Sequence, residues 1–214
     1  MSILEFFKNN FLHVAPILVA GVFAAAILIE RYKTLFVTLA MKNPSEFLEK
    51  VNQLTLTGKL NEAIALCDQL PGIPVALLVK SALTRAHQPE EVIQSGIEIS
   101  FSESAEKIQR RTSYLATVAN VSTLLGLLGT IAGLIHSFEA VGHADAQQKA
   151  ALLADGISTA MNATMLGLAV AIPCMVGFSF LTNRSNQLVK QLEHAGLQIM
   201  DSIRRSYYEV RKAS

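Results

Sequence analysis

The sequence predicts an all-α membrane protein with three transmembrane helices, two of them very long and extending into the cytoplasm, with a small helical cytoplasmic domain. Of its 214 residues 51% are hydrophobic and 16% are charged, and the mean hydropathy is +0.38. That composition leaves too little polar surface to cover a water-soluble globule of this size. In addition, three apolar runs each reach the roughly 20 residues that a helix needs to cross a hydrocarbon core.

The first apolar run covers 11–29, where His13 is the one polar side chain. No basic region precedes it and no small-residue cleavage site follows it, so we expect a retained helix rather than a removable signal. The other two runs, 112–138 and 156–183, contain no Asp, Glu, Lys or Arg. Each is long enough to span a lipid bilayer.

The distribution of Lys and Arg predicts how the chain is oriented. Ten of the eighteen lie in 31–111 and six in 184–214, whereas the start of the chain and the 139–155 segment hold one each. Basic residues accumulate on the cytoplasmic side of membrane proteins. We therefore expect a multi-pass membrane protein, with the N-terminus and the 139–155 segment facing outward and the C-terminus in the cytoplasm.

These patterns divide the chain into seven segments. They are an interfacial amphipathic helix (1–12), a first transmembrane helix (13–30), a cytoplasmic helical domain (31–111), a second transmembrane helix (112–138), a periplasmic loop (139–155), a third transmembrane helix (156–183) and a cytoplasmic C-terminal helix (184–214).

Turn residues divide the first part of the cytoplasmic domain into three short helices. One opens at Pro44 and closes at Gly58, a second is stopped by the Pro and Gly at 71–72, and a third begins at Pro74. After Pro89 the helical period continues into the second span without another proline. We therefore expect one helix of about 50 residues there, which would be about 75 Å long.

Several classes of function are disfavoured. The net charge is +1 and no Lys/Arg block is present, which argues against a nucleic-acid partner. Five scattered histidines and no phosphate-binding or metal-binding motif argue against an enzyme or a bound cofactor. We interpret Cys67 and Cys174 as small buried hydrophobic residues.

Small residues form one face of the second span. Gly126, Gly129 and Gly133 share this face, and the last two have the GxxxG spacing that favours close helix packing. We assign Gly167 of the third span to the same packing.

The polar groups of the spans suggest an ion path. Thr123, Thr130 and Ser137 recur every seven residues along the second span, and the third span carries Ser158, Thr159, Asn162 and Thr164. A threonine in a membrane helix often donates to the carbonyl four residues back, so any one of them has a purely structural explanation. Because the two spans contain no Asp, Glu, Lys or Arg, either nothing is conducted or the group that holds the ion, commonly a carboxylate, comes from another chain.

Two stretches resemble the paired signature of the ExbB/TolQ/MotA proton-channel family. They are STLLGLLGTIAGLIHSF from Ser122 to Phe138 and GISTAMNATMLGLAVAIP from Gly156 to Pro173. The cytoplasmic stretch GKLNEAIALC, 58–67, is also similar to that family, and three spans favour the ExbB/TolQ branch. The resemblance extends from about residue 12 to residue 210.

The resemblance implies a location in the bacterial inner membrane, with the N-terminus in the periplasm and the C-terminus in the cytoplasm. It also implies a homopentamer in the lipid bilayer whose second and third spans enclose a pore. Two ExbD/TolR-like single-span partners, each carrying a membrane Asp, would fill that pore. The family pattern places Thr130 and Thr164 on the ion path, and we add Thr123, Thr159 and Asn162 as ion-pathway candidates. The expected function is an ion-conducting stator subunit, which couples ion flow to work on the cell envelope such as outer-membrane transport, envelope maintenance or gliding motility.

One departure from the family pattern leaves the transported ion open. Family members usually carry Glu five residues before the third-span threonine, where this chain has Thr159. Neutral oxygen ligands suit a hard cation, so both H⁺ and Na⁺ remain possible. The alternative function is a non-conducting membrane scaffold that forms oligomers through its glycine faces.

Overall fold

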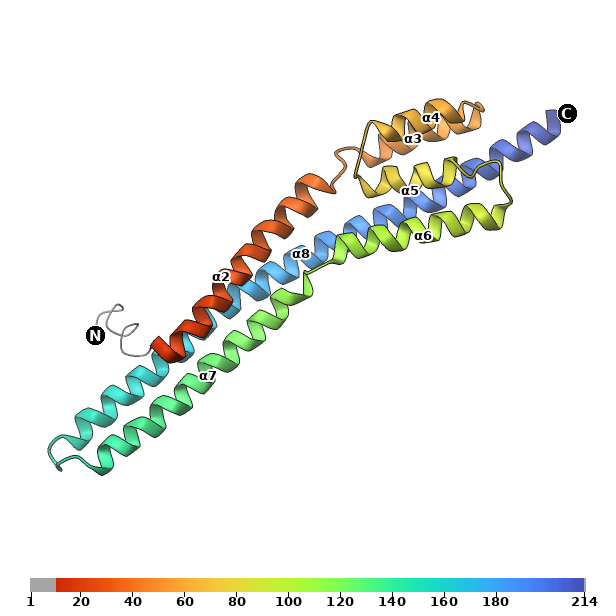
Figure 1. The fold of residues 1–214 in the computed structure, drawn as a ribbon. Coiled ribbons are helices and arrows are strands. Elements are labelled where there is room, and N and C mark those ends of the chain that lie inside the picture. Colours follow the sequence, from red (N-terminus) through yellow and green to blue (C-terminus); the bar gives the residue numbers. More distant parts are fainter. Residues whose placement is uncertain (1–10, 214) are drawn as a thin grey trace. The chain divides into compact units, whose positions relative to one another are not determined.

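The computed structural model describes residues 11–213 and the side chains of 15–207. The elements are α2 (Phe11–Lys33), the π-helical turn η1 (Thr34–Thr38), α3 (Pro44–Leu56), α4 (Leu60–Asp68), α5 (Pro74–Leu83), α6 (Glu90–Gln109), α7 (Ser113–Gly142) and α8 (Lys149–Ala213). Figure 1 labels the α-helices. No strand occurs in the described part of the chain, which confirms the all-α class. Most of the predicted interfacial helix at 1–12 lies outside the described residues.

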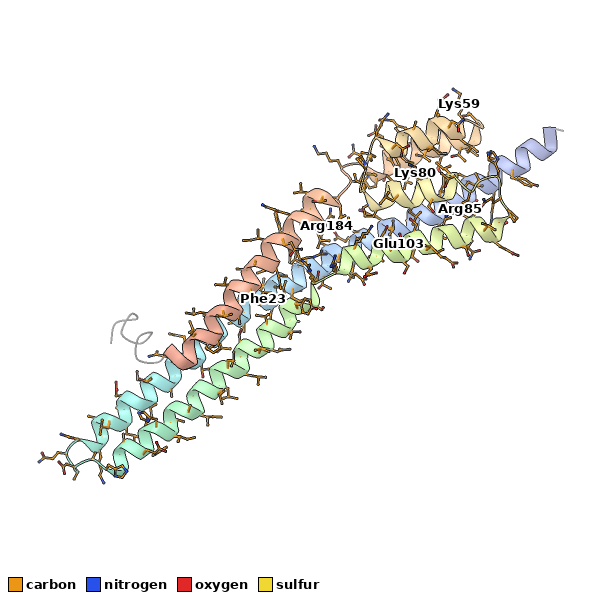
Figure 2. All side chains as sticks on the ribbon, viewed as in Figure 1. Phe23, Lys59, Lys80, Arg85, Glu103 and Arg184 are labelled. Atoms are coloured by element: carbon orange, nitrogen blue, oxygen red, sulfur yellow. The ribbon has the colours of Figure 1, made fainter. Side chains whose placement is uncertain are left out.

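Three of these helices are long and apolar enough to cross a membrane, as predicted. Less than a third of the most apolar stretch of each is buried within the chain. Large apolar side chains therefore remain exposed, among them Phe23 of α2, which Figure 2 labels, Leu124 of α7 and Met165 of α8. Surfaces of this kind are stable against lipid or against other chains.

The chain forms two compact units, Met1–Arg31 with Arg111–Phe180, and Tyr32–Arg110 with Leu181–Ser214. In the first unit α2 packs on α8 through small residues. A Cβ at Gly21 would lie 3.3 Å from the Val170 side chain, and one at Gly177 would meet Leu28. The unit thus holds α2, α7 and the first half of α8, and α7 and α8 run side by side in Figure 1.

The second unit is a helical domain in which consecutive helices from α3 to α6 pack on one another. Its core includes Leu78 and Val79 of α5 and Leu192 of α8, all fully buried. The α8 helix closely approaches α6, because a Cβ at Gly196 would lie 3.2 Å from the Ile97 side chain. These contacts make the C-terminal half of α8 part of a packed domain.

The predicted starts of α3 and α5 and the predicted stops after α3 and α4 are confirmed. Pro44 and Pro74 each occupy the first turn of a helix, where a missing N–H costs nothing. Gly58 and Gly72 have φ values of +73° and +84°, a left-handed conformation that glycine adopts without steric cost. Cys67 and Cys174 are free and buried, also as predicted.

The prediction of a single helix of about 50 residues after Pro89 is wrong. The α6 helix ends at Gln109, α7 begins at Ser113, and Arg111 between them has φ of +60°. Neither Pro nor Gly marks this break in the sequence, so local signals could not reveal it. A tertiary contact accompanies it, because Nη1 of Arg111 lies 2.9 and 3.1 Å from the two carboxylate oxygens of Glu30.

The predicted loop of 139–155 is also too long. The α7 helix continues to Gly142 and α8 starts at Lys149, so the loop is 143–148. Charged residues at 139, 149 and 155 suggested the end of an apolar span, and a helix can continue beyond the apolar part of its sequence. The α7 and α8 helices therefore extend beyond the charge-free stretches, which end at 138 and begin at 156.

The buried thiol of Cys67 gives a first testable prediction. Burial, and to a smaller extent the charge of Asp68, raises the pKa of Cys67 from 9.0 to about 11. Because only the thiolate reacts with alkylating reagents, we expect Cys67 in a Cys174→Ala protein to react about 100-fold more slowly at pH 8 than an unperturbed thiol. The reaction should accelerate as the pH approaches 11.

The matched control for Cys67 lies on the same helix. Ala65 of α4 is exposed, so an Ala65→Cys variant in a protein lacking both native cysteines should react at the ordinary rate. The folded state favours the neutral thiol of Cys67, so its contribution to stability is complete below pH 9 and declines as the pH rises towards 11. Equal rates at Ala65→Cys and Cys67 would contradict this prediction.

Candidate functional site

The α7 and α8 helices approach each other backbone to backbone along a seam of small residues. A Cβ at Gly167 would lie 2.6 Å from the Ser122 carbonyl oxygen and 2.9 Å from Cα of Gly126. Farther along the seam, a Cβ at Gly129 would lie 2.7 Å from Cβ of Ala163. Real Cβ atoms do not approach one another this closely, so glycine is required at these positions.

The seam continues towards the loop between the two helices. A Cβ at Gly133 would lie 3.0 Å from Cβ of Ala160, and one at Gly156 would overlap the Ser137 side chain. The Ser137 hydroxyl donates to the Gly133 carbonyl at 2.7 Å. Ser137 is thus buried in the contact between the helices rather than turned towards a partner.

The seam has a consequence for the scaffold hypothesis. Gly126, Gly129 and Gly133 face α8 of their own chain, so they form an internal contact. An oligomer cannot form through a face that the same subunit already covers. The proposal of assembly through exposed glycine faces is therefore wrong for this face of α7.

Two threonine hydroxyls meet in the middle of the seam. The Thr130 and Thr164 hydroxyls contact each other directly, although 34 residues separate them in the sequence. Thr130 Oγ1 also lies 3.2 Å from the Gly126 carbonyl oxygen and 3.3 Å from that of Ala160. Thr164 Oγ1 lies 3.1 Å from the same Gly126 oxygen.

The hydrogen-bond donors and acceptors of the two hydroxyls determine which third group the pair can bind. Each hydroxyl has one hydrogen and two acceptor positions. When Thr130 donates to Thr164, Thr164 donates to the Gly126 carbonyl, and both hydrogens are used within the chain. Acceptor positions remain on both oxygens. In this arrangement the pair can accept a hydrogen bond from a protonated acid or coordinate a cation.

The other ion-pathway candidates are not joined to this pair by hydrogen bonds. Thr123 is exposed and donates to the Ala119 carbonyl of its own helix at 3.0 Å. Thr159 and Asn162 are half-buried on α8, and neither side chain has a hydrogen bond to another described residue. Only Thr130 and Thr164 are brought together.

Ser122 is a feature of the seam that sequence reasoning missed. Its side chain is fully buried, and its hydroxyl has no hydrogen-bond partner among the described residues. A buried polar group without a partner costs about 1–3 kcal/mol. Its position four residues before Gly126, on the small-residue face, could have indicated that Ser122 is buried in the seam.

Ser122→Ala should therefore stabilise the protein. Removing an unpaired hydroxyl and introducing a better helix former should raise the unfolding free energy by about 1 kcal/mol. Thermal unfolding of the purified protein in detergent would measure this change. Ser137→Ala is the control, because its hydroxyl has a partner, and it should lower the stability. A lower melting temperature for Ser122→Ala would contradict the prediction.

The residues of the seam match a known family. A family model described as the MotA/TolQ/ExbB proton channel family matches residues 73–194, more than half of the chain. The chain belongs to this family. The match includes both helices of the seam and therefore Thr130 and Thr164.

Individual relatives agree with this family. The chain is 27% identical over 206 residues to a biopolymer transport protein ExbB homolog of Methanothermobacter thermautotrophicus, covering 93% of this chain and 72% of the relative. It is 35% identical over 103 residues to the Tol-Pal system protein TolQ of Haemophilus influenzae, covering 47% and 45%. It is 34% identical over 92 residues to the biopolymer transport protein ExbB of Salmonella typhimurium, covering 42% and 37%.

The matched part thus spans less than half the length of these TolQ and ExbB proteins. Family membership and the three apolar helices make the chain an inner-membrane protein of a proton-channel family. The described residues contain no group of three metal-binding side chains.

Proposed function

We propose that this protein is an ion-conducting stator subunit of an inner-membrane motor. It would couple ion flow to mechanical work on the cell envelope, together with an ExbD/TolR-like partner. The observation that carries this proposal is the contact between the Thr130 and Thr164 hydroxyls. It places a polar, uncharged pair between two spans that contain no charged residue.

The partner supplies the carboxylate that the second and third spans lack. In its protonated form the partner's Asp would donate a hydrogen bond to a free acceptor position of the hydroxyl pair. In its ionised form the carboxylate would accept from a hydroxyl that turns away from the Gly126 carbonyl. The pair can serve both forms without carrying charge, which lowers the cost of moving a titrating acid past hydrocarbon.

The family supports an assembly that converts this titration into motion. Five copies would surround two partner helices, so the two Asp residues would occupy different positions relative to the ring. Alternate protonation of the two acids would then favour stepwise rotation. The N-terminus would lie in the periplasm and the C-terminus in the cytoplasm, in accord with sixteen of eighteen Lys and Arg residues on the cytoplasmic segments.

We favour protons as the transported ion. The half-buried Thr159 and Asn162 make Na⁺ the alternative. Their side-chain oxygens are neutral ligands of a kind that hard cations accept. The driven process would be outer-membrane transport, envelope maintenance or gliding motility. The scaffold alternative loses its main support, because the glycine face is internal.

The proposal is tested by ion flux through the reconstituted complex. The protein is co-expressed with an ExbD/TolR-like single-span partner and placed in liposomes with a membrane potential. Proton entry is followed with a pH dye and Na⁺ entry with a sodium dye. We expect flux of one ion, and its loss when the partner's membrane Asp is changed to Asn. A complex that conducts neither ion would overturn the proposal.

A further inference from the structure

A row of polar residues lies on the exposed face of α7. Ser113, Thr117, Asn120 and Thr123 follow one another at intervals of four, three and three residues, and all four are exposed. Such intervals keep side chains on one side of a helix. We name this row the α7 polar lane.

Asn120 is the member of the lane that hydrocarbon cannot accommodate. The Thr117 and Thr123 hydroxyls donate to carbonyls of their own helix, at 3.5 and 3.0 Å. Asn120 has two donors and an acceptor on its carboxamide, and none of them has a partner among the described residues. An unsatisfied amide in a lipid core costs several kcal/mol. This side of α7 must therefore meet water or another polar group.

The position of the lane links it to the hydroxyl pair. Asn120 lies ten residues before Thr130, which is about 15 Å along a helix axis. The lane ends at Ser113, the first residue of α7. The lane therefore leads from Thr123, seven residues before Thr130, to the end of the helix that adjoins the cytoplasmic segment.

The lane is bordered by large apolar side chains. Val121, next to Asn120 and about 100° around the helix, is 43% exposed. Leu127, between Thr123 and Thr130, is 52% exposed. The polar surface is thus narrow, and an apolar turn separates it from the hydroxyl pair.

We propose that the α7 polar lane is the hydrated release route by which the transported ion passes between the Thr130–Thr164 pair and the cytoplasm. Asn120 orders the water of this route: its amide oxygen accepts from a hydrated proton or coordinates a cation, and its amide nitrogen donates to the next water. Leu127 separates this water from the pair. The inference rests on the proposed function and adds the cytoplasmic half of the ion path.

Water access along α7 tests the lane directly. Single cysteines are introduced at Asn120 or Val121 in a protein carrying Cys67→Ala and Cys174→Ala, co-expressed with its partner. Inverted membrane vesicles, which expose the cytoplasmic side, are treated with a charged, membrane-impermeant methanethiosulfonate reagent. We expect Asn120→Cys to react roughly tenfold or more faster than Val121→Cys, because only a hydrated thiol ionises readily. Equal rates, or faster reaction at Val121→Cys, would overturn the proposal.

Ion flux provides the second readout. Asn120→Leu should reduce flux about tenfold or more, which corresponds to about 1.4 kcal/mol. Asn120→Gln should restore most of it, and Val121→Leu should leave it unchanged. If Thr130→Val with Thr164→Val abolishes flux while Asn120→Leu does not affect it, the lane is wrong and the stator function stands. If the unmodified complex conducts no ion, the stator function fails, and the role of the lane fails with it.

Discussion

Replacing Thr130 and Thr164 together by valine is expected to reduce ion flux at least about 100-fold while the complex still assembles. Valine has nearly the shape of threonine, so the seam between α7 and α8 remains filled. What disappears is the contact between the two hydroxyls and their bonds to the Gly126 carbonyl.

The size of the effect follows from the hydrogen bonds lost to the titrating acid. A hydrogen bond to a charged group contributes about 1.5–3 kcal/mol, so two of them correspond to about 3–6 kcal/mol. Each 1.36 kcal/mol changes a rate about tenfold, so a decrease of at least about 100-fold follows.

The measurement is flux in liposomes, with assembly verified by co-purification of the partner. Ser137→Ala serves as the matched control, because its hydroxyl also lies on α7 but donates only to the Gly133 carbonyl of its own helix. That variant should retain most of the flux. Unchanged flux in the double valine variant would remove the hydroxyl pair from the ion path.

Gly167→Ala is expected to destabilise the packing of α7 on α8 by about 3 kcal/mol or more. The added Cβ would lie 2.6 Å from the Ser122 carbonyl oxygen and 2.9 Å from Cα of Gly126. Both are backbone atoms, which cannot move away as a flexible side chain can. The two helices would have to separate, and their other contacts would weaken.

Thermal unfolding of the purified complex in detergent would measure this loss. Gly142→Ala is the matched control, because a Cβ there would meet nothing within 4 Å. It should leave the melting temperature unchanged or raise it slightly, since alanine favours the helix. A Gly167→Ala protein as stable as the Gly142→Ala protein would show that the seam is looser than described.

A Gly129→Leu variant distinguishes a glycine face that packs within the subunit from one that joins different subunits. If the face joined different subunits, Gly129→Leu would dissociate the oligomer and leave the monomer folded. Because Gly129 faces Ala163 of its own chain, we expect the variant to lose helix packing within the subunit. Limited proteolysis of the isolated subunit would distinguish the two outcomes.

Much of the fold followed from local sequence signals. The apolar runs predicted three long helices, and proline and glycine residues predicted the starts of α3 and α5 and the ends of α3 and α4. These features depend on neighbouring residues alone, through backbone sterics and the length that a bilayer requires. The resemblance assigned Thr130 and Thr164 to the ion path, although helix periodicity could not show that their hydroxyls touch.

Other features depended on contacts between distant residues. The break at Arg111 accompanies its ion pair with Glu30, 81 residues away, and no breaker residue marks it. The unpaired hydroxyl of Ser122 is defined by burial against another helix. Asn120 became informative only when its exposure and its lack of a partner were known.

By itself the sequence determined the class of protein, the number of apolar spans and the absence of charge from two of them, because composition and period are properties of the chain alone. The tertiary structure decided that the glycine face is internal and that the Thr130 and Thr164 hydroxyls meet. The physical reason is that helix period fixes which residues share a face, whereas the rotation and register of one helix against another depend on packing.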